Sequence, residues 1–201
     1  MQLKPITAII VLLLVVASLL VAGCTSSSSP TATPAAQATA TPQPTYVPKS
    51  TPGYLNYTNR SAGVAIQYPS SWRATEGDVN ITVGFSLPGT IVSFDVVRPD
   101  DLSGSKLSLD EYAQLILQEL KQNSSFPSFT LLNSSNVTLA GYPAHEFVFT
   151  VVFEGITVQF KIEVTIIDNT GYALVYGATT GVYPDYAATA GNMIASFHLV
   201  K

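Results

Sequence analysis

The chain has 201 residues, of which 47% are hydrophobic and 11% are charged, and its formal net charge is −4. Nucleic acid is excluded as a partner, and so is a polybasic patch for a membrane surface, because the sequence has no cluster of Lys and Arg to neutralise phosphates. Cys24 is the one cysteine. An intramolecular disulfide and a cysteine-based zinc site are therefore excluded.

The first 23 residues have the pattern of an export signal. Lys4 gives a positive start and residues 6–23 are almost wholly apolar. The segment closes in the order of a bacterial-type lipobox: Val21, Ala22, Gly23 and Cys24. We expect cleavage before Cys24 and a lipid on its thiol. The alternative is an uncleaved transmembrane anchor, since residues 6–23 are at the lower limit of length for a bilayer. Both alternatives place the rest of the chain outside, because Lys4 keeps the N-terminus inside.

Residues 24–53 follow as a stalk. They carry one charge, Lys49, and are rich in Ser, Thr and Pro. A segment of this composition cannot build a core, so we expect it to be disordered or polyproline-like. Residues 54–201 are long enough for one self-sufficient core, and we expect them to form a monomeric globular domain.

Asparagines of the domain fall mostly in sequons, which are acceptors for N-glycosylation. Ser/Thr-rich loop composition is the alternative explanation, since Asn and Ser are both turn residues. We favour glycosylation at some of these sites, and a lipobox together with many sequons is typical of an archaeal cell surface. The candidate asparagines are Asn56, Asn59, Asn80, Asn123, Asn133 and Asn136.

The first half of the domain reads as strands followed by a helix. Strands are predicted over 63–68, 80–86 and 90–97 from their β-branched and aromatic residues and the turn signals between them. Ser108 and Glu111 form a capping box, in which each side chain satisfies a backbone N–H of the other residue. Apolar residues then recur at helical spacing, which predicts an amphipathic helix over 109–122.

The second half predicts an antiparallel meander and a final helix. Residues 145–153 and 156–166 alternate between apolar and other side chains, 172–178 forms a third strand, and short turns join them. A last apolar stripe over 183–197 has helical spacing. The fold class is therefore α+β, an antiparallel sheet packed with two amphipathic helices. The face of the central strand from Thr157 to Thr165 is polar, so we expect both helices to lie mainly on the opposite Phe160 face.

Three short motifs, at Val64 to Trp72, Leu139 to Ala144 and Ile194 to Phe197, together resemble PsbP-like domains. An apolar strand ending in Tyr-Pro with a Trp close behind resembles their opening motif, and a middle strand–turn segment and a closing helix end are also similar. The resemblance implies an α/β sandwich over about 64–200. It implies no photosynthetic role, because no residue matches a photosynthetic metal or binding site.

Residues typical of catalysis or metal binding are few. His145 and His198 lie far apart in sequence with no ligand at metal-binding spacing, so both are interpreted as structural or solvent-facing. No known nucleophile, nucleotide or zinc-protease motif is present. The acidic loop 98–104 could offer oxygen ligands to calcium, but a solvated turn before a helix explains it equally well. We predict no catalytic residue, no metal and no cofactor.

The function that these features favour is a non-catalytic binding or assembly module, held by its lipid on the outer face of the cytoplasmic membrane. A protein partner at the cell surface is expected, and the polar face from Thr157 to Thr165 is the predicted contact. Two alternatives remain at this level. One is an extracytoplasmic hydrolase without a recognisable motif, and the other is a structural glycoprotein of the envelope.

Overall fold

The computed structural model describes residues 51–124, 126 and 128–200. The predicted signal, the lipobox, Cys24 and the stalk up to residue 50 lie outside the described residues. Within the part that is described, no helix has the length and apolar character needed to cross a bilayer.

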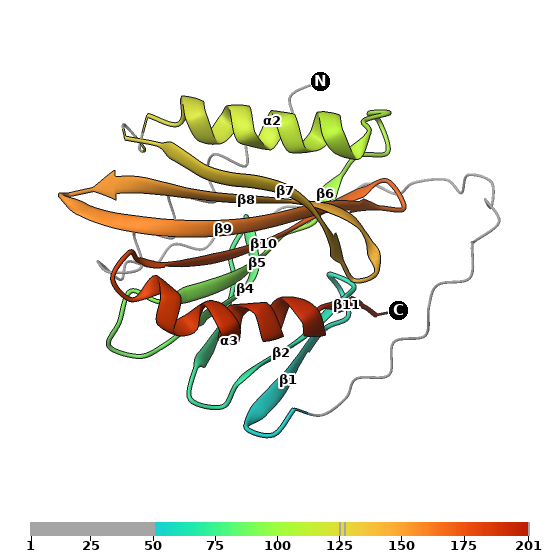
Figure 1. Ribbon diagram of the computed structural model, residues 1–201. Coiled ribbons are helices and arrows are strands. Elements are labelled where there is room, and N and C mark those ends of the chain that lie inside the picture. The colour runs from blue at the N-terminus through green and yellow to red at the C-terminus, as the bar shows by residue number, and fades with distance from the viewer. Residues whose placement is uncertain (1–50, 125, 127, 201) are drawn as a thin grey trace, which may run out of the picture.

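Strands dominate the chain, with two long helices set among them (Figure 1). The predicted strands and both predicted helices are present, with ends shifted by a few residues. The elements in order are β1 (Tyr54–Asn59), β2 (Val64–Pro69), β3 (Arg73–Glu76), β4 (Ile81–Ser86), β5 (Ser93–Val97), β6 (Asp100–Asp101), α2 (Leu109–Gln122), β7 (Thr130–Leu139), β8 (Tyr142–Phe153), β9 (Ile156–Ile167), β10 (Thr170–Thr179), α3 (Tyr183–Ser196) and β11 (His198–Leu199).

Two antiparallel sheets are formed. The larger has eight strands in the order β3-β4-β5-β10-β9-β8-β7, with β6 paired to β10 beside this path. The predicted meander is its centre, because β8, β9 and β10 are consecutive neighbours. The smaller sheet has the order β1-β2-β11 and joins the start of the described chain to its end. Of this sheet only β2 was predicted as a strand, and in the larger sheet β3, β6 and β7 were not predicted.

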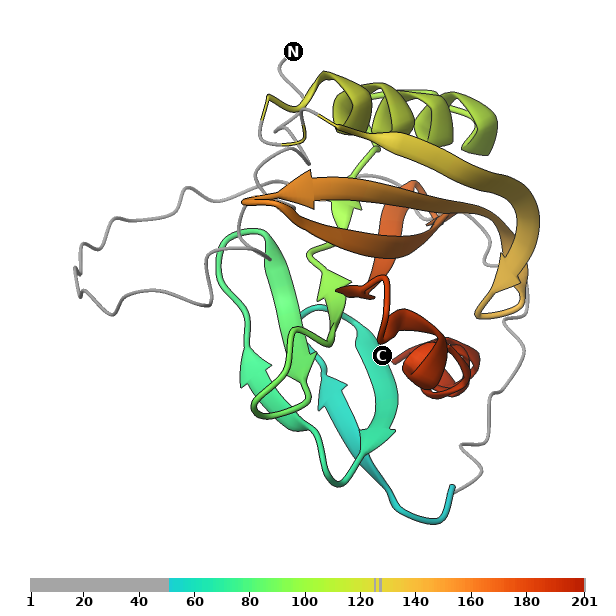
Figure 2. The ribbon, with the colours of Figure 1, turned by 60° about the vertical axis from the view of Figure 1, so that its left-hand side comes forward.

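Helix α2 covers one face of the large sheet (Figures 1 and 2). Its capping box is present: the Glu111 N–H donates to the Ser108 hydroxyl, and the Ser108 N–H donates to the Glu111 carboxylate. Tyr112, Ile116 and Leu120 are buried against aromatic residues of β8 and β9. Among these, the Phe160 ring stacks on Phe149 with centroids 5.4 Å apart. This is the core predicted on the Phe160 face.

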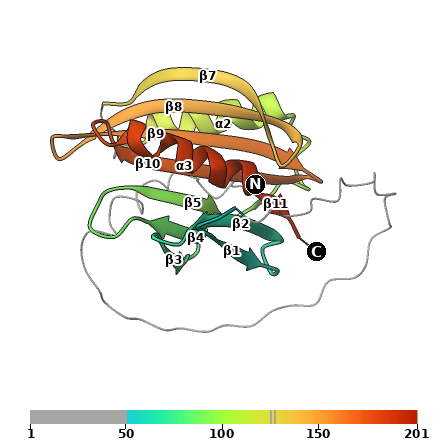
Figure 3. The same cartoon turned by 60° about the horizontal axis from the view of Figure 1, so that its bottom comes forward.

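Helix α3 lies on the opposite face, next to the small sheet. Figure 3 shows it running along β10 and beside β2. Ser196 connects this helix to β2, because its hydroxyl accepts a hydrogen bond from the Gln67 N–H. The same hydroxyl donates to the Met193 carbonyl within the helix. A second core packs here around Phe85, Tyr176 and Met193. The expectation that both helices lie mainly on the Phe160 face is therefore wrong for α3.

The polar face of β9 is partly buried beneath this second layer. Glu163 is 5% exposed and Thr165 is fully buried, whereas Thr157, Gln159 and Lys161 are partly exposed. Thr165 is satisfied because its hydroxyl donates to the Pro143 carbonyl at 2.7 Å. The prediction of an open polar face is wrong for Glu163 and Thr165. Alternation showed which residues share a face, but not what packs on it.

Candidate functional site

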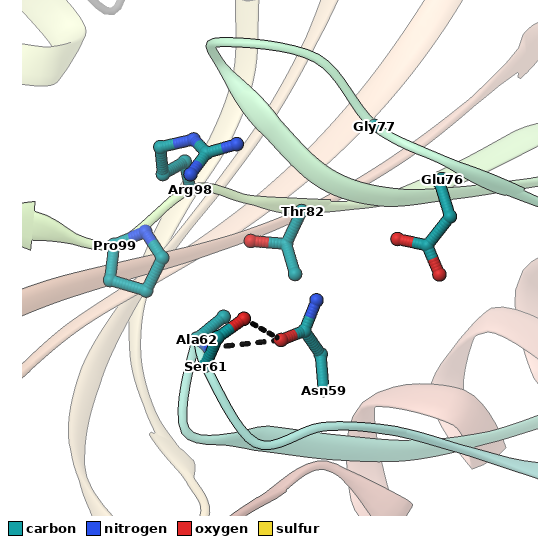
Figure 4. Close-up of a pocket in the computed structure, with 8 residues that line it drawn as sticks. All are labelled: Asn59, Ser61, Ala62, Glu76, Gly77, Thr82, Arg98 and Pro99. Atoms are coloured by element: carbon teal, nitrogen blue, oxygen red, sulfur yellow. Dashed lines mark hydrogen bonds between the residues drawn. The ribbon is translucent and has the colours of Figure 1, made fainter. Parts of the chain in front are cut away.

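A polar pocket of about 440 Å³ opens between the turn of the β1–β2 hairpin and the turn of the β3–β4 hairpin. Figure 4 shows its wall residues converging from four separate segments of the chain. This volume is within the range of small-molecule sites, about 300–1,000 Å³. The lining residues are Asn59, Ser61, Ala62, Glu76, Gly77, Thr82, Arg98 and Pro99.

Thr82 lines the pocket because β4 has a bulge at this position. Ile81 pairs with Val97 and Val83 pairs with Val96, so Thr82 is the extra residue without a partner in the ladder. Bulges of this kind redirect a side chain and are common beside functional sites. The Thr82 hydroxyl is buried and has no hydrogen-bond partner within the described residues. A buried polar atom left in this state costs about 1–3 kcal/mol, so a ligand that pairs with it recovers free energy.

Arg98 supplies the positive charge of the pocket. It follows β5 directly, and its backbone N–H donates to the Asn80 carbonyl. One nitrogen of its guanidinium, Nη2, donates to the Asp78 carbonyl at 2.6 Å. The other guanidinium N–H groups have no hydrogen-bond partner within the part of the chain described. They are therefore available to an anionic group in the pocket.

Glu76 supplies the negative charge, at the end of β3. Its carboxylate accepts from the Tyr57 hydroxyl, and Tyr57 in turn accepts from the Asn59 side-chain amide at 3.3 Å. Burial raises the pKa of Tyr57, and the negative charge of Glu76 adds to this. The hydroxyl therefore stays protonated and holds the carboxylate in place.

Gly77 fixes the turn between β3 and β4. Its N–H donates to the Thr82 carbonyl, and a Cβ here would collide with the Ile81 carbonyl. Only glycine allows the two backbones to approach so closely. The turn therefore depends on this residue, and the turn brings Glu76 near Thr82.

A second group of charges lies on the α3 side of the large sheet. Lys161 on β9 pairs with Glu146 on β8 and lies 3.5 Å from Glu163. Burial raises the pKa of Glu163, an effect that Lys161 opposes and Glu146 reinforces. The pKa of Lys161 is also raised: burial alone would lower it, but the hydrogen bond and charge of Glu146 and the charge of Glu163 outweigh that effect. Lys161 offsets only one of the two negative charges, and its ion pair with Glu146 connects β9 to β8.

One carboxyl group is buried without compensation. Asp95 on β5 is 5% exposed, and one of its oxygens has no hydrogen-bond partner among the described residues. Burial raises the pKa of Asp95 to about 8. Asp95 does not line the pocket, but it makes the stability of the domain depend on pH.

The candidate glycosylation sites differ in their surroundings. Asn56, Asn133 and Asn136 are exposed on strands, and Asn80 is partly exposed beside the Asp78 turn. Asn123 is 5% exposed at the C-terminal end of α2, where the folded chain leaves no room for a glycan. Asn59 is a wall residue of the pocket. Its side-chain carbonyl accepts from Ser61 and from the Ala62 N–H, so a glycan on its amide would stand in the pocket.

Neither histidine lies in the pocket. His145 on β8 lies 2.8 Å from Asp110 in the first turn of α2, and its ring stacks on Phe147. His198 Nδ1 lies 2.9 Å from the Ser196 carbonyl. Both contacts connect elements of the fold.

The acidic loop considered for calcium has other partners. The Tyr112 hydroxyl donates to Asp100, and the Ser103 N–H donates to Asp101. No group of three or more His, Cys, Asp or Glu side chains that could hold a metal ion occurs in the described ranges. From this loop only Arg98 and Pro99 reach the pocket.

Comparisons with solved structures identify the fold. The cyanobacterial PsbP protein of Synechocystis superposes with a TM-score of 0.59 at 12% identity, over 75% of this chain and 94% of that protein. The fold is PsbP-like. LpqN of Mycobacterium tuberculosis, which is involved in cell envelope biogenesis, gives 0.53 at 16% identity, over 69% of this chain and 83% of its own. The protein Mog1, as an E65A mutant, gives 0.54 at 11% identity, over 74% and 96%.

No family model and no curated protein matches this sequence. At these identities the superpositions show the fold, and the site rests on the geometry of the chain itself. Sequence reasoning missed the pocket, because its walls come from segments about forty residues apart at their extremes, between Asn59 and Pro99. Gly77 and the neighbouring Asp78 carried a turn signal, but nothing in the pattern indicated what the turn would face.

Proposed function

We propose that this protein is a non-catalytic binding module that takes a small polar solute in the pocket between its two N-terminal hairpins. The observation that carries this proposal is Thr82, a wall residue of the pocket whose buried hydroxyl lacks a hydrogen-bond partner within the described residues. Native structures rarely leave such a group unpaired without a reason. A cation and an anion, Arg98 and Glu76, lie in the same pocket and provide further polar contacts for a ligand.

We further propose that the module acts outside the cell, held to the membrane by a lipid on Cys24. The lipobox pattern that ends at this cysteine supports the anchor, and the role of LpqN in cell envelope biogenesis agrees with such a setting. Mass spectrometry of the mature N-terminus tests it. A lipid mass on Cys24 is expected. An unmodified cysteine that still follows residues 1–23 contradicts it.

Thermal unfolding tests the binding role. The full-length chain, purified in detergent, is melted with a panel of polar solutes: amino acids, sugars, phosphate and sugar acids. At least one class should raise the melting temperature, because a ligand that binds only the folded state stabilises it. The same solute should have a much smaller effect on Thr82→Val, which removes the hydroxyl and keeps the shape of the side chain.

Thr138→Val is the matched control, since Thr138 is exposed on β7 and belongs to the other end of the sheet order. It should respond to the solute as the unaltered chain does. The binding role is rejected if no class of solute shifts the melting temperature. Binding at this pocket is also rejected if the solute raises the melting temperatures of Thr82→Val and Thr138→Val by the same amount.

A further inference from the structure

The arrangement of charge in the pocket narrows the class of ligand. Arg98 and Glu76 are the ionisable residues of the lining, and they carry opposite charges. In Figure 4 they lie on opposite sides of Thr82, with Arg98 next to Pro99 and Glu76 next to Gly77. The pocket is therefore neutral as a whole but polarised along its length.

A ligand with a single charge fits this arrangement poorly. An anion attracted to Arg98 is repelled by Glu76, and a cation attracted to Glu76 is repelled by Arg98. The more distant charge therefore offsets part of the attraction to the nearer one, because both energies fall with distance in the same way. An uncharged solute leaves both side chains without a charged partner.

A solute with one positive and one negative end fits both sides at once. The free N–H groups of Arg98 suit a carboxylate, because charge-assisted hydrogen bonds of this kind are among the stronger ones. The Thr82 hydroxyl lies between the two charges, where it can donate to the same carboxylate. Glu76, held by the Tyr57 hydroxyl, suits an ammonium group.

We propose that the pocket recognises a zwitterion of the amino-acid type, with its carboxylate at Arg98 and Thr82 and its ammonium group at Glu76. This inference rests on the binding role proposed above and adds the class of ligand and its orientation. The distance between its two charges is set by the separation of Arg98 and Glu76 across the pocket. Ligands with the same groups but a different spacing should therefore bind less well.

Isothermal titration of the full-length chain in detergent tests this proposal. The probes are glycine, 4-aminobutyrate and 6-aminohexanoate, which carry both charges at increasing separation. Butyrate and butylamine, each with one charge, are the matched comparisons. One of the three zwitterions should bind at least about tenfold more tightly than either singly charged probe, the effect expected from one charged hydrogen bond.

Two variants test the orientation. Arg98→Gln should abolish the advantage of the zwitterion over butylamine, and Glu76→Gln should abolish its advantage over butyrate. Each substitution should weaken binding of the zwitterion about tenfold or more. Arg73→Gln is the control, because Arg73 is exposed on the same strand as Glu76 and does not line the pocket. It should leave the affinity unchanged.

The outcomes separate this inference from the proposed function. If butyrate or butylamine binds as tightly as the zwitterions, the ligand class is wrong while the binding role stands. The same conclusion follows if none of the five probes binds but a sugar or phosphate stabilises the chain at Thr82. If Arg73→Gln weakens binding as much as Arg98→Gln, the loss of affinity follows from removing any positive charge nearby. The assigned orientation of the ligand is then wrong.

Discussion

Replacing Phe160 by alanine should be among the most damaging single changes in the domain. Phe160 is 2% exposed on β9. One face of its ring stacks on Phe149 at 5.4 Å, and a Cβ on Gly177 would lie 2.6 Å from the ring. The ring therefore lies over the backbone of β10, in space that only glycine leaves open. No neighbour can easily move into the cavity that truncation would create.

The size of the effect follows from these contacts. Truncation to alanine removes about 150 Å² of buried apolar surface, which corresponds to about 4 kcal/mol at ~25 cal/mol per Å². Loss of the stacking with Phe149 adds about 0.5–1.5 kcal/mol. We therefore expect the free energy of unfolding to fall by about 4–5 kcal/mol, at the upper end of the range for such substitutions.

Chemical denaturation followed by Trp fluorescence measures this change. Trp72 is the single tryptophan and is buried in the second core, so it reports unfolding far from the substitution. Phe153→Ala is the matched control, because Phe153 is only partly buried at the β8–β9 hairpin and should cost about 1–2 kcal/mol. Gln159→Ala, on the opposite and partly exposed face of β9, should cost less than about 1 kcal/mol. The assignment of faces is refuted if Gln159→Ala costs as much as Phe160→Ala.

Four further predictions concern stability. Because burial raises the pKa of Asp95 to about 8, the folded state keeps a proton that the unfolded chain loses near pH 4. The free energy of unfolding should therefore fall by about 1.4 kcal/mol for each unit that the pH rises between these values. Asp95→Asn should remove this slope in denaturation curves measured from pH 5 to 8. Lys161→Ala should cost about 2 kcal/mol at neutral pH and less as the pH falls, because burial raises the pKa of Glu163 and a protonated Glu163 no longer needs the cation. A cost that does not change with pH contradicts the ion-pair explanation. Ser108→Ala should cost about 1 kcal/mol through loss of the capping box, and a neutral result would contradict this role. Residues 54–201 expressed alone should melt cooperatively as a monomer, whereas a molten or aggregated fragment would reject the domain boundary.

Local signals were enough to predict the parts of the fold that depend on neighbouring residues. The α2 helix followed from Ser108, Glu111 and the apolar stripe behind them, and the structure confirms its bounds and its cap. The β8–β10 meander followed from strict alternation and short turns. In these segments the side chains that specify the structure are adjacent in sequence, so a periodic pattern contains the information.

Other parts depend on contacts between distant segments. The strand β7 has the sequence TLLNSSNVTL, whose Asn and Ser residues favour turns, and it is a strand because it pairs along β8 at the edge of the sheet. Glu163 and Thr165 indicated an open face, but Lys161 and the Pro143 carbonyl satisfy them beneath α3. Strand pairing overrides the local preference in β7, and packing of the second layer overrides it at Glu163 and Thr165.

The pocket depends even more on distant contacts. Its central residue, Thr82, was placed correctly in a predicted strand, but the bulge that turns its side chain into the pocket arises from the register with β5. A periodic pattern gives no sign of a residue that the partner strand skips. Arg98 was noted only as part of an acidic loop, and its role became visible once the β1–β2 turn was placed opposite it.

The direction of the β1–β2 hairpin decides which way the pocket opens relative to the rest of the chain. Tyr54 begins β1 at one end and Asn59 ends it at the other, beside the pocket, so the two residues are five steps of strand apart, about 17 Å. Anything that holds the protein through its N-terminus is therefore attached at the far end of this strand from the binding residues. If the proposed anchor on Cys24 is real, the length of the segment before β1 should therefore be changeable without loss of ligand binding.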